Sequence, residues 1–168
     1  MKRNSNEKKL KRRRNIFCFF AVIYIALLLY FLFFSEHYGR NIRSESYRYN
    51  LKPFEEIGRF IKYRNAFTLE FFLVNMVGNV VAFMPFGFFL PIISGKFEKF
   101  YLAIFLTAFF SLMIESLQLA TRVGSFDVDD IILNTTGGLL GYIIFKLCRG
   151  AFRKPAKKKM KKRNVRQQ

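Results

Sequence analysis

Four long stretches of the chain contain no charged residue, and they comprise residues 16–35, 71–95, 100–114 and 131–145. The charges gather elsewhere, since 18 of the 29 Lys and Arg lie in residues 1–14 and 149–168. A soluble domain could not cover so much apolar side chain, because 52% of the 168 residues are hydrophobic, 23 are Phe, and the net charge is +18. The segregation therefore predicts an integral membrane protein, with apolar segments inside a bilayer and charges at its surfaces.

The charge-free stretches have the length of transmembrane helices. About 20 apolar residues are needed to cross a hydrocarbon layer roughly 30 Å thick. We expect an all-α integral membrane protein, a bundle of four transmembrane helices within residues 16–148, with spans at about 16–34, 71–93, 100–120 and 131–148. A cleaved signal peptide is the alternative for the first span. The run is longer than a usual signal core, and Ser35-Glu36-His37 does not match the small-residue pattern of a cleavage site, so a retained helix is favoured.

Basic residues predict the orientation of the spans, because short basic segments beside a span stay cytoplasmic. Residues 1–15, the turn at Lys96 and Lys99, and the tail 149–168 are basic, and four spans place both termini on one side. We therefore expect a multi-pass protein of the cell membrane with both termini cytoplasmic and a disordered tail. Anionic lipids of the inner leaflet are the expected partners of these charges, at about 1 kcal/mol per cation. Nucleic-acid binding is disfavoured, because no aromatic residues alternate with the basic ones.

The polar segment 36–70, expected outside, contains a short helical pattern. Apolar residues recur at Phe54, Ile57, Phe60 and Ile61. Pro53 precedes them, acidic residues occupy the first turn, and basic residues occupy the last, as a helix dipole favours. The pattern predicts a short amphipathic helix, either lying on the outer membrane interface or packed over the bundle as an ordinary surface helix.

Polar side chains inside spans are costly, so each is a functional group or a device for helix contacts. With the predicted orientation they all fall in the outer third of the membrane, and they are Asn75, Asn79, Glu115, Gln118, Arg122, Asp127, Asp129, Asp130 and Asn134. A shared depth favours one polar cavity that opens outward. We take these residues as the candidate ligand-binding cluster.

Each of these polar residues also has a structural explanation. One aspartate could cap the fourth helix, Arg122 could pair with an aspartate, and the two Asn could bond across helices. Glu115 is the hardest to explain in this way, because an acid within a span must pair, protonate or touch water. No resident cofactor is expected, but a divalent cation, if one binds, would suit the carboxylates of Glu115, Asp127 and Asp130. No Ser-His-Asp set, phosphate-binding glycine loop or zinc pattern is present, so enzymatic activity is left open.

Small residues and prolines bear on helix packing. Gly137, Gly138 and Gly141 permit close helix contact, expected within the bundle rather than between copies. Pro85 and Pro91 predict a kink or interruption in the second span.

Four motifs, in this order and spacing, resemble the VanZ-like family of small bacterial membrane proteins. They are RYNLKPF (48–54), NMVGNVVAFMPFG (75–87), ESLQ (115–118) and FDVDDIILNTTGG (126–138). The resemblance runs from about residue 48 to 145. It carries over Asn79, Glu115, Gln118, Asp127, Asp130 and Asn134 as a signature, without a catalytic assignment.

The resemblance implies a role in the bacterial envelope. The family is named after an accessory protein of glycopeptide-resistance clusters, which is associated with reduced susceptibility to the lipid-tailed antibiotic teicoplanin. We therefore expect a protein whose polar site binds a lipid head group, a wall precursor or the antibiotic. The alternatives are a membrane enzyme that acts on a lipid phosphate or glycolipid with a carboxylate-bound divalent cation, and a helper that binds a partner enzyme through its helices.

Overall fold

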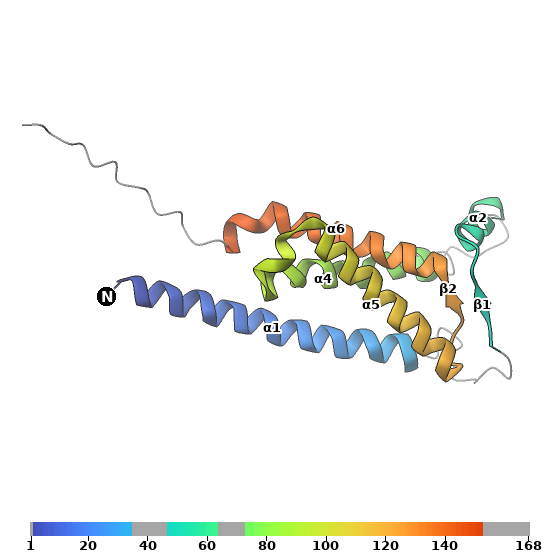
Figure 1. Ribbon diagram of the computed structural model, residues 1–168, viewed down its shortest axis with the longest axis horizontal. Helices are drawn as coiled ribbons and strands as arrows, with labels where there is room; N and C mark the ends of the chain where they lie inside the picture. The colour runs from blue at the N-terminus through green and yellow to red at the C-terminus, as the bar shows by residue number, and fades with distance from the viewer. Residues whose placement is uncertain (1, 35–46, 64–72, 153–168) are drawn as a thin grey trace, which may run out of the picture.

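Four long helices form the molecule (Figure 1). The computed structural model describes residues 2–34, 47–63 and 73–152. The long helices are α1 (Lys2–Phe34), α4 (Gly78–Ile93), α5 (Phe100–Thr121) and α6 (Val128–Phe152). Four stretches are long and apolar enough to cross a membrane, and they are Lys11–Phe34, Asn75–Ile93, Phe100–Thr121 and Val128–Arg149. The second consists of α4 and the residues 75–77 that precede it. The predicted all-α membrane fold with four spans is thereby confirmed.

Short elements connect the long helices, and two of them are strands of two residues each. In chain order they are β1 (Tyr49–Asn50), α2 (Glu55–Lys62), the π-helix η2 (Leu73–Val77), the 3₁₀-helix η3 (Gly95–Glu98) and β2 (Phe126–Asp127). The helical pattern around Phe60 predicted α2, with Glu55 and Glu56 in its first turn and Arg59 and Lys62 in its last.

Successive long helices run in opposite directions, so the molecule has two distinct ends (Figure 1). At one end lie α2, β1 and β2, together with the end of α5 and the start of α6; we call it the α2 end. At the other end lie the N-terminus, the turn η3 and the end of α6; we call it the η3 end. The turn is fastened to α6, because the Glu98 carbonyl accepts hydrogen bonds from Tyr142 Oη at 2.6 Å and Lys146 Nζ at 3.0 Å, and its carboxylate pairs with Arg149.

Some helix boundaries differ from the predicted ones. The first helix begins at Lys2 instead of near residue 16, because Lys and Arg are good helix formers and continue the apolar helix outward. The fourth begins at Val128, three residues before the expected 131. Two predictions lie partly outside the described residues: the start of the second span at 71–72, and the disordered tail, of which 153–168 are not described.

Glycines bring α4 and α6 into close contact, as expected for packing within the bundle. A Cβ on Gly137 would lie 2.1 Å from the Val80 carbonyl oxygen, and one on Gly141 would lie 1.8 Å from that of Met84. The two backbones therefore touch where no other residue would fit.

Of the kink or interruption expected at the prolines of the second span, an interruption is absent from α4, which is helical through Pro85 and Pro91, and a kink stays a prediction. A neighbouring helix contributes a hydrogen bond in this region, where Tyr24 Oη of α1 donates to the Ala82 carbonyl at 2.6 Å. The irregular turn of this span is instead η2, which precedes α4.

Candidate functional site

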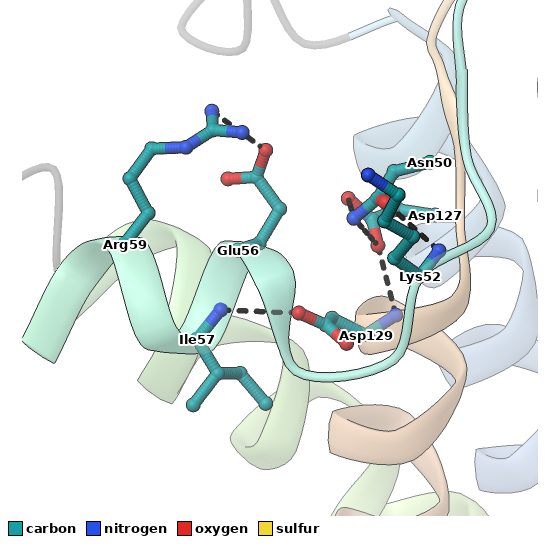
Figure 2. Close-up of polar contacts among 7 residues, drawn as sticks. All are labelled: Asn50, Lys52, Glu56, Ile57, Arg59, Asp127 and Asp129. Atoms are coloured by element: carbon teal, nitrogen blue, oxygen red, sulfur yellow. Dashed lines mark hydrogen bonds and ion pairs between the residues drawn. The ribbon is translucent and has the colours of Figure 1, made fainter.

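A two-residue parallel strand pair ties the segment 47–63 to the start of α6. Tyr49 lies opposite Phe126, and Asn50 lies opposite Asp127. The Asn50 side chain reinforces the pairing, since its Nδ2 donates to Asp127 Oδ1 at 3.2 Å (Figure 2). Strands this short leave no pattern in the sequence, so the pairing was not predicted.

Asp129 holds α2 by its N-terminus, although it belongs to α6. Its Oδ1 accepts the backbone N–H of Phe54 at 2.5 Å, and its Oδ2 accepts that of Ile57 at 3.0 Å. Figure 2 shows the carboxylate pointing at the first turn of α2. Phe54 has a left-handed backbone, with φ of 65°, and α2 therefore begins one residue after it, at Glu55. The buried carboxylate, 1% exposed, supplies the capping acceptor that α2 lacks in its own sequence.

Asp127 caps α6, which bears out the structural explanation for one aspartate. Its Oδ1 accepts the N–H of Asp129 at 2.8 Å, the position an N-cap residue satisfies. Burial raises the pKa of the Asp127 carboxyl, while the hydrogen bonds from the Asp129 N–H and from Asn50 oppose that rise. This cap explains why the fourth helix begins earlier than its apolar run.

Glu115 of α5 contacts the backbone of Asp127, the residue that caps α6. Its side chain is only 3% exposed, and its Oε2 accepts the backbone N–H of Asp127 at 3.2 Å. Across the bundle, Asn79 of α4 donates to Asp130 of α6 at 2.5 Å. Acidic and amide residues of α4, α5 and α6 therefore make contacts at the α2 end, and their common depth in the membrane stays a prediction.

A polar stripe continues from Glu115 toward the middle of the bundle. Thr107 and Ser111 precede Glu115 by eight and four residues, so they share its helix face, and both are fully buried. Asn134 Nδ2 of α6 donates to Ser111 Oγ at 2.9 Å, while Asn134 Oδ1 is buried with no partner among the described residues. We did not single out Thr107 and Ser111 in the sequence, although their spacing from Glu115 could have identified them.

Gln118 and Arg122 make contacts outside the carboxylate group. Gln118 Nε2 donates to the Leu32 carbonyl of α1 at 3.0 Å. Arg122 ends α5 in a left-handed conformation with φ of 58°. Its guanidinium lies 4.5 Å from the Tyr47 ring centroid and donates to Tyr47 Oη at 3.3 Å. The structural explanation in which Arg122 pairs with an aspartate is not the observed one, because this side chain contacts Tyr47 of the segment 47–63.

The carboxylates proposed for a divalent cation accept hydrogen bonds from different donors. Glu115 accepts a backbone N–H, Asp127 accepts Asn50 and a backbone N–H, and Asp130 accepts Asn79. Within residues 2–34, 47–63 and 73–152, no three acidic, His or Cys side chains are placed to share a metal ion. Binding of a divalent cation stays a prediction, and the described residues do not provide a set of ligands for it.

Comparison with known proteins covers the α2 end, three whole spans and the first span from residue 19 onward. The family model described as VanZ/LLP1 matches residues 19–149. The chain belongs to the VanZ/LLP1 family. Protein VanZ of Enterococcus faecium is 30% identical over 132 residues, which cover 74% of this chain and 70% of that protein. No solved structure matches the chain.

Membership in the VanZ/LLP1 family confirms the resemblance seen in the four motifs. With four membrane-spanning helices, it makes the chain a multi-pass membrane protein. The family match contains every residue of the predicted polar cluster, but it leaves the basic residues 2–14 outside.

Proposed function

We propose that this protein lowers the susceptibility of a bacterium to glycopeptide antibiotics such as teicoplanin. In this proposal the polar site at the α2 end binds a lipid head group, a wall precursor or the drug itself. The family and the Enterococcus faecium relative support the setting. The observation that carries the site is Glu115, an acid 3% exposed in a membrane-spanning helix, whose Oε2 accepts the backbone N–H of Asp127 where β2 leads into α6.

In this proposal the residues of the cluster have two roles: some hold the segment 47–63 in place, and others contact the ligand. Asp127 and Asp129 are occupied by the strand pair and the two helix caps, so they hold the segment 47–63 in place. Glu115 and Asn134 lie deeper, and Asn134 retains a buried amide oxygen without a partner among the described residues. A buried acceptor that lacks a donor is costly, so a ligand or water that donates a hydrogen bond would stabilise this position. We therefore assign ligand contact to Glu115 and Asn134.

The proposal places the α2 end outside the cell and both termini in the cytoplasm. Support comes from the basic residues of α1, which extend from the η3 end, whereas acids and bases are mixed at the α2 end. The exposure of α2 supports an interfacial position for this helix. Ile61 is 69% and Phe54 is 61% exposed, while Phe60 is buried, so one side faces the bundle and apolar groups remain for lipid.

The test is a resistance measurement on the variant Glu115→Gln. A glycopeptide-susceptible Gram-positive host would carry the unaltered gene, Glu115→Gln or Ser116→Ala, and the minimum inhibitory concentration of teicoplanin would be measured. We expect Glu115→Gln to lose most of the increase in that concentration, because the amide keeps the size of the side chain but removes its charge. Ser116→Ala should keep it, since Ser116 is exposed and its hydroxyl donates to the Leu112 carbonyl of its own helix.

Membrane levels of each variant, measured by immunoblot, distinguish loss of the site from loss of the protein. If Glu115→Gln lowers the level, Asn134→Ala serves as the second variant, because among the described residues its side chain contributes one hydrogen bond, to Ser111. Full resistance in both variants at normal levels would exclude the site from the function. The enzymatic alternative gains no metal ligand set among the described residues and stays a prediction.

A further inference from the structure

One face of α1 combines cations with aromatic side chains around an open hollow. The hollow has a volume of about 590 Å³. Lys8, Lys11 and Arg12 line one part of it, followed along the helix by Ile16, Phe19 and Phe20. Spacings of three and four residues place them on one side of a helix. The cations and the aromatic residues share one helix face because α1 begins at Lys2 and continues as a helix through the basic residues.

This face points away from the rest of the bundle. Phe17 follows Lys8 by nine residues, which is two and a half turns at about 3.6 residues per turn, so the two side chains point in opposite directions. Phe17 packs against Phe89 of α4, with ring centroids 6.4 Å apart. Tyr24, a further seven residues along, bonds to α4 on the same side as Phe17. Phe19 is 64% and Phe20 is 53% exposed, so described parts of the bundle leave this face uncovered.

The change from charged to apolar residues on this face lies where α1 enters the bilayer. The candidate span starts at Lys11, so the cations sit at the head-group level and the aromatic residues sit beside acyl chains. An occupant that fits both parts must join an anionic group covalently to a long apolar chain. Inorganic phosphate has no apolar part, and a zwitterionic head group presents its own cation to the lysines.

We propose that this face of α1 binds one molecule of an anionic phospholipid. The phosphate lies between Lys8, Lys11 and Arg12, and an acyl chain runs along Ile16, Phe19 and Phe20. The three cations precede residue 19, where the family match begins, so the site is separate from the shared polar cluster. It also lies toward the η3 end, opposite the proposed glycopeptide-related site, and does not depend on that proposal.

The proposal is tested with the purified full chain in a neutral detergent. Fluorescent phosphatidylglycerol is titrated in, with phosphatidylcholine of the same acyl chains and inorganic phosphate as comparisons. We expect saturable binding of one phosphatidylglycerol per chain, at least tenfold weaker binding of phosphatidylcholine, and no displacement by millimolar phosphate. Equal binding of the two lipids, or displacement by free phosphate, would overturn the proposal.

Two double variants with the same loss of charge separate a defined site from general attraction. Lys11→Gln with Arg12→Gln removes two cations that line the hollow, and we expect binding about 30-fold weaker, from about 1 kcal/mol per cation at about 1.4 kcal/mol per factor of ten. Arg13→Gln with Arg14→Gln removes two exposed cations that do not line it, and we expect less than a threefold change. Equal weakening by both pairs would show diffuse attraction and refute the site. The altered residues are exposed, and thermal unfolding of each variant confirms that its fold is retained.

Discussion

At the scale of single residues, chemically similar carboxylates do different work. From the sequence, Asp127, Asp129, Asp130 and Glu115 form one acidic group at one depth. The structure distinguishes them by the groups they accept, since Asp129 accepts two N–H groups at the start of α2, whereas Glu115 accepts the N–H of Asp127 just before α6. Asp129 accepts the free N–H groups at the start of α2 and so stabilises that helix. We therefore expect the loss of Asp129 to weaken the order of α2 before it affects the rest of the bundle.

We predict that Asp129→Ala loosens α2 while the bundle remains folded. The variant leaves the N–H groups of Phe54 and Ile57 without their acceptor, and a lost helix cap costs about 1 kcal/mol. Hydrogen exchange followed by mass spectrometry should show residues 55–62 exchanging about fivefold faster, because that free energy corresponds to roughly this factor. The control is Glu56→Ala, which removes an ion pair with Arg59 at 2.9 Å between partly exposed side chains and keeps both contacts of Asp129. Equal acceleration in both variants would contradict the capping role.

At the scale of elements, the sequence predicts the helices, because each helix depends on residues that are close together in the chain. The four spans follow from runs of apolar residues, and α2 follows from its own helical period. The strand pair could not be predicted, because Asn50 and Asp127 are 77 residues apart. The same reason hid the cap of α2, whose acceptor Asp129 is 75 residues from Phe54. Contacts at such separations are set by the packing of whole helices and leave no local pattern.

We predict that Gly141→Ala destabilises the contact between α4 and α6. The new Cβ would lie 1.8 Å from the carbonyl oxygen and 2.7 Å from the carbonyl carbon of Met84, and backbone atoms cannot yield without moving the helices apart. Overpacking of this kind costs about 1–3 kcal/mol. Thermal unfolding in detergent should therefore begin at a clearly lower temperature than in the unaltered protein.

The matched control for Gly141→Ala is Gly58→Ala in α2. A Cβ at Gly58 meets nothing within 4 Å, and alanine favours a helix over glycine by about 1 kcal/mol. Its unfolding temperature should be unchanged or slightly higher. A common decrease in both variants would mean that a general effect of the added methyl group, and not the α4–α6 contact, determines stability.

At the scale of the whole molecule, the two ends carry different chemistry. The α2 end gathers buried carboxylates and amides, with α2 held over them by Asp129. The η3 end gathers cations, because Lys146 and Arg149 fasten the turn at Glu98 and the basic residues of α1 extend beyond it. This difference predicts a single orientation in the membrane, since basic residues near spans stay in the cytoplasm.

We predict that a membrane-impermeant maleimide labels intact cells at Lys62→Cys and not at Lys99→Cys. Both positions are exposed, Lys62 at the end of α2 and Lys99 just after η3, so accessibility depends on the side of the membrane (Figure 1). The background carries Cys18→Ala and Cys148→Ala, because both native cysteines are free thiols. Permeabilised cells should be labelled at both positions, which controls for reactivity. The reverse pattern would place Glu115 toward the cytoplasm, where a site for wall precursors or an external antibiotic has no access to its ligand, and the proposed function would fail with the orientation.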